Sequence, residues 1–309
     1  MTYQLYKMTF TSSHFGQGSL ESASLSFSAD RLFSALFLES LKLGKDEELL
    51  ALAQSPDFVL SDAFPYLEEV FLPKPIGYPT LDKLKESPDV EKQRIQAKKS
   101  KKLAYLTQTE FADFLEGQLP PERKGKYSQF TLLTKNSLVT IEQEGQVGLY
   151  NLGIQTYQGL SLYVIASDAP LMKDLLTSLQ YSGLGGKRTS GYGRFDLEVL
   201  GVPEKLAQSL TLDHQGPVML LTSALPVDQE LEKAMKNGKY LLEKCSGFAF
   251  SQTVKTNLRK QDIYKFKAGS TFAETFEGEI LDLRPVGFPH PVWHFAKPFF
   301  YKLEVANEA

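Results

Sequence analysis

A glycine-rich segment with adjacent cations is the part of this 309-residue chain best suited to bind an anion. It runs from Gly183 to Phe195, reads GLGGKRTSGYGRF and contains five glycines. Such a turn can hold backbone N–H groups outward, and another backbone can approach closely because glycine has no side chain. Lys187 and Arg188 would make that approach favourable for phosphate. The segment therefore predicts a phosphate-binding turn, and the alternative is a surface loop with solvated cations.

Two common phosphate-binding loops do not fit this segment. A Walker loop requires Ser or Thr after its Gly-Lys pair, but Arg188 follows that pair here, and Tyr181 stands where the first glycine belongs. The dinucleotide-binding fingerprint needs a strand before its glycines and a helix after them. Here a helical pattern over 169–181 comes first and a strand pattern over 194–200 follows. A nucleotide-cofactor loop is therefore excluded.

The histidines and the cysteine form no recognisable metal or catalytic motif. His290 and His294 have the spacing of a zinc pair on a helix, but Pro289 and Pro291 flank the first histidine and disfavour a helix. Cys245 is the one cysteine, which excludes a disulfide framework and a cysteine-based zinc site. The chain also lacks a Ser-His-Asp order, GGDD-like carboxylates, an HD pair and an H-E-x-x-H motif. We therefore expect no metal, no cofactor and no catalytic activity.

Bulk composition indicates a folded protein of about two domains. The chain is 42% hydrophobic and 12% aromatic, and its formal net charge is −3. A net negative charge means that RNA binding would depend on local basic patches, with acidic surface left for protein partners. The N-terminus has a strand pattern and not that of a signal peptide, and the longest apolar runs are too short to span a membrane. We expect a cytoplasmic protein.

Apolar periodicity predicts alternating strands and helices in the first half of the chain. Ser28 suits the N-cap of a helix, and Gly44 suits its end. The order strand, helix, strand, strand, helix, strand predicts a ferredoxin-like domain. The expected strands are 3–10, 58–60, 70–72, 137–142, 148–154, 159–166 and 194–200, and the expected helices are 28–43, 46–54 and 169–181.

The second half of the chain is expected to consist mainly of strands. We place a linker at 202–216, with Pro203 and Pro217 at its edges, between a first domain (1–201) and a second (217–309). The expected strands of the second domain are 218–224, 240–245, 248–251, 263–272, 278–284 and 299–305, and its one expected helix is 228–237.

A basic stretch interrupts the first domain at about 78–135, where cations outnumber apolar residues over long runs. A solvated charged face is the default interpretation of such a stretch, and contact with phosphates is the alternative. The cations are Lys83, Lys85, Lys92, Arg94, Lys98, Lys99, Lys101, Lys102, Arg123, Lys124 and Lys126.

Several segments together resemble one protein family. The glycine segment fits the pattern G-x-G-G-K/R-x-x-S/G-x-G-x-F between a helix and a strand, which resembles the signature loop of the RAMP superfamily of CRISPR-associated RNA-binding proteins. Within it, the chain is similar to the subunit 4 family of the type III-A effector (Csm complex), which caps the 5′ handle of the guide RNA. The supporting segments are His14-Phe15-Gly16, SADRLFSAL from Ser28, SDAFPYLEEVFLPKP from Ser61, the strand 247–252 and GFPHPVWHFAKPFF from Gly287.

This resemblance implies an α+β fold of two ferredoxin-like (RRM-like, RAMP) domains. The second would be degenerate, and the basic stretch would be a thumb-like insert in the first. It implies a non-catalytic RNA-binding subunit that grips the repeat-derived 5′ handle of the crRNA in antiviral defence. The implied protein partners are the large polymerase-domain subunit and a backbone-filament RAMP subunit, which this chain would join.

The resemblance also assigns the RNA-binding residues and places the segment 287–297 near the glycine segment. Some assignments have a plain alternative: Trp293 could equally be a core residue, whereas Phe248 and Phe250 are expected in the core. The expected RNA-binding residues are His14, Phe15, Arg31, Gly185, Gly186, Lys187, Arg188, Tyr192, Arg194, Lys255, Arg259, Arg284, His290, Trp293 and His294.

Two alternative functions remain, a protein-only assembly factor that retains no RNA and a nuclease, and His14 supports the second. In RAMP-related guide-processing nucleases, a histidine in the corresponding loop cleaves RNA without a metal as general acid or base. By analogy, the chain would be an endoribonuclease that processes precursor crRNA. The competing interpretation, which we favour, is a histidine that hydrogen-bonds RNA or packs within its loop.

Overall fold

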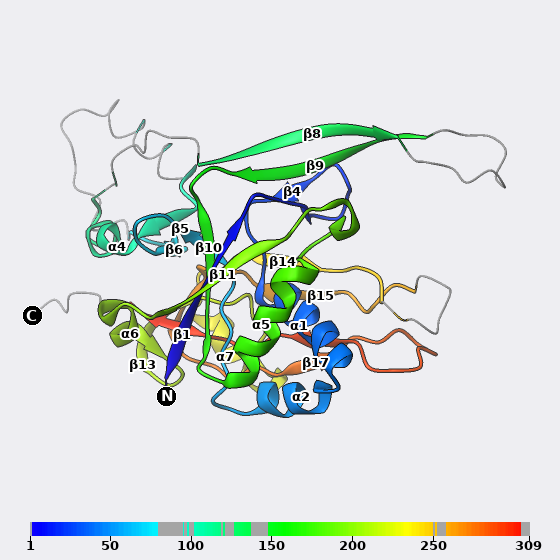
Figure 1. Cartoon of the computed structure of the whole chain (residues 1–309). Coiled ribbons are helices and arrows are strands. Elements are labelled where there is room, and N and C mark those ends of the chain that lie inside the picture. Colours follow the sequence, from blue (N-terminus) through cyan, green and yellow to red (C-terminus); the bar gives the residue numbers. More distant parts are fainter. Residues whose placement is uncertain are drawn as a thin grey trace, which may run out of the picture.

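The computed structural model describes residues 2–79, 95, 98, 102–118, 120, 127–136, 148–249, 251 and 258–303 (Figure 1). The expected strand 137–142, most cations of the basic insert and Lys255 lie outside these residues. Within the described part, no helix combines the length and the apolar character needed to cross a bilayer.

The first sheet has the strand order β11-β1-β10-β5 with antiparallel neighbours. Its strands are β1 (Tyr3–Phe10), β5 (Phe64–Tyr66), β10 (Ser161–Ser167) and β11 (Phe195–Gly201). Along the chain, α1 (Ala29–Leu43) lies between β1 and β5, and α5 (Pro170–Ser182) lies between β10 and β11. The expected strand 3–10 and the helix beginning near Ser28 are confirmed.

Both faces of the first sheet are buried, because alternate residues of a strand point to opposite sides. On one side, Met8 packs in a core with Leu36 of α1 and Leu175 of α5. On the other side, Leu5 packs in a second core with residues of the second sheet. The helix α1 packs on the Met8 side of the sheet because its buried residues recur at helical spacing and form one apolar stripe.

The second sheet has the strand order β12-β19-β13-β16. Its strands are β12 (Leu210–Thr211), β13 (Gln215–Leu220), β16 (Thr271–Glu274) and β19 (Phe300–Lys302). Met219, Phe299 and Tyr301 share the second core with Leu5 and Tyr163 of the first sheet. The two sheets therefore stabilise each other through one common core.

Two further strand pairs and a surface helix complete the second half. They are β14 (Leu242–Cys245) with β15 (Ile263–Phe266), β17 (Ile280–Asp282) with β18 (Trp293–Phe295), and α7 (Asp228–Lys236). The segment 293–303 returns to the first half, where the Phe295 ring lies 5.6 Å from that of Phe33 in α1. Lys297 Nζ donates to the carbonyls of Ala53 (3.1 Å) and Ser55 (2.5 Å) at the end of α2 (Asp46–Gln54).

Several expected elements differ from the structure. The expected strand 263–272 is two strands, β15 and β16, because the chain turns at Gly269 with φ 92°. Among their described residues, the expected strands 58–60 and 248–251 contribute isolated bridges, from Leu60 to Ala166 and from Phe248 to Arg259. The expected linker contains α6 (Glu204–Ser209) and β12, and β12 pairs with β19.

A long hairpin extends along one side of the molecule (Figure 1). It consists of β8 (Ser128–Asn136) and β9 (Leu149–Tyr157), and β9 also pairs with the short β2 (Ser12–Ser13). The turn beyond β2 is closed by β3 (Phe15–Gly16) and β4 (Ala23–Ser24). The hairpin is thereby anchored on the loop that follows β1.

Part of the basic insert forms regular structure. The described elements nearby are β6 (Phe71–Pro73), β7 (Tyr105–Thr107) and α4 (Gln108–Leu115), and β6 pairs with β7. Thr107 and Glu110 form a capping box at the start of α4. This T-x-x-E pattern could have predicted α4 from the sequence.

Candidate nucleic-acid interface

The glycine loop (residues 183–195) connects the end of α5 to the start of β11 and is closed at its base by backbone hydrogen bonds. The N–H of Leu184 donates to the Gly193 carbonyl (2.8 Å), and the N–H of Gly193 donates to Ser12 (2.9 Å). A Cβ at Gly193 would lie 2.0 Å from the Leu184 carbonyl oxygen. Glycine is therefore required where the two arms of the loop approach each other.

His14 holds the glycine loop against the hairpin. Its Nδ1 donates to the Gly153 carbonyl at 2.7 Å, and the N–H of Gly186 donates to the His14 carbonyl at 2.9 Å. A Cβ at Gly185 would lie 2.8 Å from that carbonyl, and one at Gly186 would lie 2.7 Å from the imidazole ring. These close approaches explain why residues 185 and 186 are glycines. His14 thereby connects β2 to both β9 and the glycine loop.

The neighbouring Phe15 is not an RNA-facing residue. Its side chain is fully buried, and its ring packs edge-on against Phe10 (5.5 Å) and Phe27 (5.0 Å). The predicted RNA contact of Phe15 is therefore wrong: the ring belongs to the first core.

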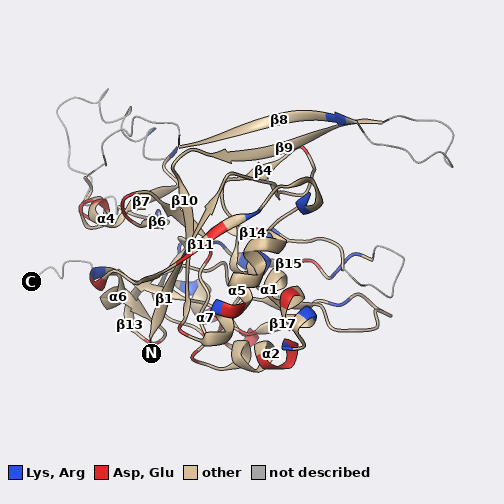
Figure 2. Cartoon of the chain, viewed as in Figure 1, with Lys and Arg blue, Asp and Glu red and all other residues tan. Residues whose placement is uncertain are grey.

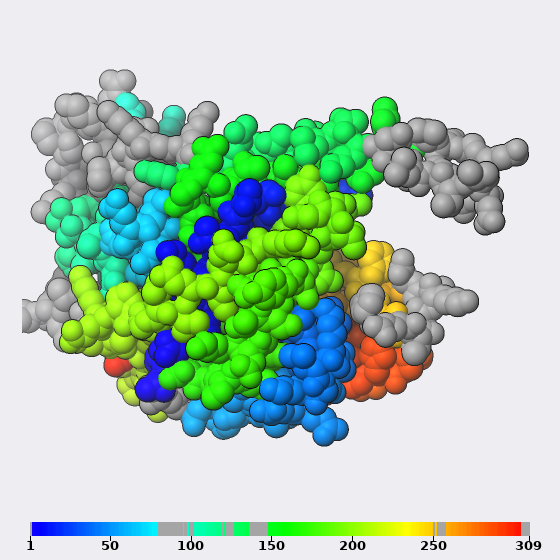
Figure 3. Space-filling model, in the orientation of Figure 1, coloured from blue at the N-terminus to red at the C-terminus, as the bar shows by residue number. Residues whose placement is uncertain are grey.

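Two lysines and two tyrosines bring the loop and the hairpin together. Lys187 Nζ lies 4.7 Å from the centre of the Tyr150 ring, and Lys135 Nζ lies 5.1 Å from that of Tyr192. Lys135 and Tyr150 face each other across β8 and β9. Figure 3 shows the loop lying against the hairpin. Lys187 and Tyr192 were expected at the site, whereas Lys135 and Tyr150 were missed because their pairing depends on the strand register.

More cations line the same end of the molecule. Arg188 and Arg194 are exposed on the glycine loop, and Figure 2 marks Lys or Arg positions in blue both on this loop and at the end of β8. Arg31 donates from Nη2 to the Gly16 carbonyl at 2.8 Å, and burial lowers its pKa. Arg31 thus stabilises the turn after His14, whereas Arg188 and Arg194 are exposed to solvent.

Of the predicted residues in the second half, those that the structure describes have partners within their own segments or in the first core, and Lys255 lies outside the described residues. Arg259 lies 3.8 Å from Asp262, Arg284 is paired with Asp282, and His290 packs on Phe288 with ring centres 4.7 Å apart. Trp293 is half-buried against the first core, and β18 packs on α1. The segment 287–297 therefore lies beside α1, away from the loop between α5 and β11 (Figure 1).

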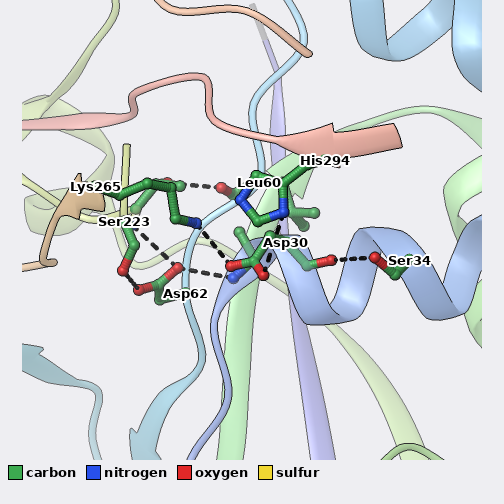
Figure 4. A network of polar contacts seen from close by, with 9 residues as sticks. Asp30, Ser34, Leu60, Asp62, Ser223, Lys265 and His294 are labelled. Atoms are coloured by element: carbon green, nitrogen blue, oxygen red, sulfur yellow. Dashed lines mark hydrogen bonds and ion pairs between the residues drawn. The ribbon is translucent and has the colours of Figure 1, made fainter. Parts of the chain in front are cut away.

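His294 is part of a buried polar network between the two halves (Figure 4). It is 1% exposed, so the predicted RNA contact is wrong for this residue. Its Nδ1 lies 3.8 Å from Asp30 Oδ2, while Asp30 Oδ1 accepts a hydrogen bond from Lys265 Nζ at 2.7 Å. Burial lowers the pKa of His294 to about 3, so the imidazole is neutral in the folded protein.

The charges of this network oppose a bound metal ion. Asp30, Cys245 and His294 each offer a ligand atom within 4.8 Å of the others. Burial alone would lower the pKa of Lys265, but Asp30 raises it overall, so the ammonium neutralises that carboxylate. Burial also raises the pKa of Cys245 to about 12, which keeps the thiol protonated. The charged Lys265 and the protonated Cys245 therefore favour the ion pair between Asp30 and Lys265 over a bound divalent cation.

Asp62 links α1 to the second half at the same junction. Its Oδ1 accepts from the Ala29 N–H (2.8 Å) and the Ser223 N–H (3.2 Å), and its Oδ2 accepts from Ser223 Oγ (2.7 Å). Ser28 occupies the N-cap position but makes no capping hydrogen bond. The helix start is therefore capped by a distant carboxylate, which sequence patterns cannot reveal.

Comparisons with known proteins match the chain throughout its length. Residues 214–303 match the family model of the CRISPR Csm4 C-terminal domain. The chain is 51% identical to the CRISPR system Cms protein Csm4 of Streptococcus thermophilus over 306 aligned residues. The alignment covers 99% of this chain and 100% of the relative.

Solved structures show the same fold. A chain of the Csm3-Csm4 subcomplex of the type III-A CRISPR-Cas interference complex aligns with a TM-score of 0.61 and 19% identity over 98% of this chain and 100% of that chain. A chain of the Csm1-Csm4 cassette in complex with cA4 aligns with a TM-score of 0.62 and 16% identity over 98% of both chains.

Proposed function

The chain belongs to the Csm4 family of CRISPR-associated proteins, and from that membership we propose that it binds the repeat-derived 5′ handle of the crRNA at its glycine loop. The family identified from sequence motifs is thereby confirmed. The observation that carries the proposal is the geometry of the loop, which His14 holds against the hairpin and which presents Lys187 and Arg188 at its tip.

The loop suits an RNA backbone for two physical reasons. Gly185 and Gly186 let the loop lie directly against His14, which fixes the backbone that carries Lys187 and Arg188. Lys187, Arg188 and Arg194 add charge attraction that does not depend on base identity. The guide sequence beyond the handle would then remain free to pair with its target.

Binding of handle-bearing RNA by wild type and by Lys187→Ala/Arg188→Ala tests this proposal. We expect the double variant to bind more weakly and to lose about 1.4 from the slope of log affinity against log salt, because two phosphate contacts on a single strand disappear. Lys205→Ala/Lys236→Ala, which removes two exposed lysines on α6 and α7, is the matched control. Equal affinities of the loop variant and the wild type at low and moderate salt would overturn the assignment.

We propose that His14 positions the loop and does not cleave RNA. Its hydrogen bond to Gly153 and its 5% exposure support a structural role. Precursor repeat RNA incubated with the purified chain and EDTA should therefore stay intact. Cleavage that disappears in His14→Ala would instead establish a metal-independent endoribonuclease.

We also propose that this chain assembles with a Csm1-type large subunit and a Csm3-type backbone subunit, and so joins one to the other. The support is the family membership and the Csm3-Csm4 and Csm1-Csm4 complexes that share its fold. Co-expression with tagged partner subunits should yield a stable three-protein complex on gel filtration. Recovery of the two partners as a complex without this chain would contradict the bridging role.

The domain plan is the remaining part of the proposal. The antiparallel order β11-β1-β10-β5, with α1 and α5 as connections, supports a ferredoxin-like first domain of the RAMP type. The second sheet would be its degenerate counterpart, and the insert would be the thumb-like element.

A further inference from the structure

We propose that Lys135, Tyr150, Lys187 and Tyr192, called here the loop–hairpin cluster, form a nucleotide subsite for single-stranded RNA. In this subsite a base stacks on a tyrosine ring and the adjoining phosphates pair with the two lysines. The inference rests on the proposed RNA-binding function and extends it from the glycine loop to the hairpin. Hairpin residues thereby become part of the binding surface.

The four side chains alternate between cation and ring where the loop meets the hairpin. Lys187 of the loop reaches Tyr150 of β9 (4.7 Å), and Lys135 of β8 reaches Tyr192 of the loop (5.1 Å). Lys135 and Tyr150 are directly opposed in the antiparallel ladder, so their Cβ atoms are about 5 Å apart. One nucleotide has the dimensions to contact rings and ammonium groups at this spacing.

Within the described part of the chain, the two lysines of the cluster contact tyrosine rings and no acidic group. Among the described residues, neither Lys135 nor Lys187 has a hydrogen-bond acceptor or a carboxylate partner. Lys7 also lies over a tyrosine, but it is paired with Glu198 at 2.9 Å. Cation–π contacts at partly exposed sites are weak, so a phosphate can replace them or add to them.

The backbone of Lys187 is a second, independent indication of function. It has φ 58°, and among the described residues it is the one non-glycine with positive φ. This conformation is unfavourable for a lysine and is usually occupied by glycine, asparagine or aspartate. A strained residue that directs its side chain at an aromatic ring suggests a function for that side chain.

A comparison of intact and abasic strands tests the subsite. Fluorescence anisotropy of the full chain would use a labelled single-stranded oligoadenylate and the same strand without bases. We expect wild type to prefer the intact strand. Tyr150→Leu and Tyr192→Leu should each weaken binding of the intact strand by about 5- to 150-fold and leave the abasic strand unaffected, because stacking needs both ring and base.

The other variants separate charge from stacking. Lys135→Gln and Lys187→Gln should weaken both strands and lower the salt slope by about 0.7 each. Tyr150→Phe should retain wild-type affinity, since the ring remains. Tyr181→Leu, which removes a tyrosine 74% exposed on α5, is the matched control and should bind like wild type.

The outcomes distinguish this inference from the proposed function. If wild type binds handle RNA but binds intact and abasic strands equally, the subsite is overturned and handle binding stands. The same holds if both Tyr→Leu variants fold and bind like wild type. The comparison of strands on wild type remains decisive if a variant fails to fold. If wild type binds no RNA, both proposals fall.

Discussion

Lys187 allows the structural and functional roles of one residue to be separated. Its positive φ costs a non-glycine residue roughly 1–2 kcal/mol, and the greater freedom of glycine in the unfolded chain offsets part of any gain on substitution. Lys187→Gly should therefore change the free energy of unfolding by no more than about 1 kcal/mol. Affinity for handle RNA should nevertheless fall, because the cation is lost.

Urea unfolding and RNA titration of the same Lys187→Gly preparation check this prediction. Lys187→Arg, which keeps a cation in the same strained position, is the control and should retain most of the affinity. A glycine variant with undiminished affinity would show that the backbone and not the ammonium matters at this position.

His294 makes stability depend on pH. Its pKa is about 3 in the folded chain and about 6.5 in the unfolded chain, so its contribution is complete above pH 6.5 and is lost as the pH falls towards 3. At pH 5 the loss is about 2 kcal/mol. His294→Gln should therefore lose less stability than wild type between pH 7 and pH 5.

The wild-type-minus-variant difference isolates this titration from that of its neighbours. Asp30 and Lys265 keep their charges over the interval, whereas burial raises the pKa of Asp62 to about 6 and gives an opposite trend in both proteins. Denaturant unfolding at each pH supplies the difference. Parallel curves for both proteins would show that His294 does not titrate as described.

At the scale of elements, the base of the glycine loop should tolerate no side chain at Gly193. An added Cβ there would overlap the Leu184 carbonyl at 2.0 Å, in addition to the strain of φ 81°. Gly193→Ala should cost more than about 2 kcal/mol and should abolish RNA binding. Gly191→Ala is the control: φ is 89°, but the space around it is open, so only the backbone cost of roughly 1–2 kcal/mol applies.

Thermal unfolding and RNA titration of the two alanine variants provide the measurement. Similar losses of stability and of RNA affinity in the two variants would mean that the close approach of Gly193 to Leu184 does not restrict which residue can occupy position 193.

Local sequence patterns predicted those elements whose causes are local. The helices α1 and α2 begin and end within a residue of the expected positions, because apolar spacing and Gly44 define them. The strand 263–272 was expected to be continuous, since its apolar residues give no sign of the turn at Gly269. That turn is set by a distant contact, as a Cβ at Gly269 would lie 2.7 Å from the Lys74 carbonyl.

The candidate site was only partly predictable for the same reason. The loop glycines and Lys187 were visible as a composition anomaly. Tyr150 and Lys135 were not predicted, because their position at the site depends on the register of β8 and β9. His294 was predicted to contact RNA, but its side chain is buried. Sequence motifs identify the family, whereas pairing and burial decide which side chains face the ligand.

At the scale of the whole molecule, the ion pair between Asp30 and Lys265 connects α1 to β15 across the junction of the two halves. Lys265→Met would leave a buried carboxylate unpaired and should cost about 3–5 kcal/mol. Asp30→Leu/Lys265→Met should cost less than the single variant, because no charge remains buried alone.

Urea unfolding followed by Trp293 fluorescence and by far-ultraviolet circular dichroism measures these losses. Coincident transitions are expected, since the two sheets share a core. A double variant as unstable as the single one would mean that packing, and not charge pairing, determines the stability of the junction.

The return of residues 293–303 to the first half has a consequence for biosynthesis. Phe295 completes the core beneath α1, and Lys297 caps the carbonyls at the end of α2. These residues leave the ribosome only after nearly three hundred others. The cores on the first sheet therefore stay incomplete until residues 293–303 have left the ribosome. A nascent chain stalled before residue 293 exposes apolar surface that a chaperone can recognise.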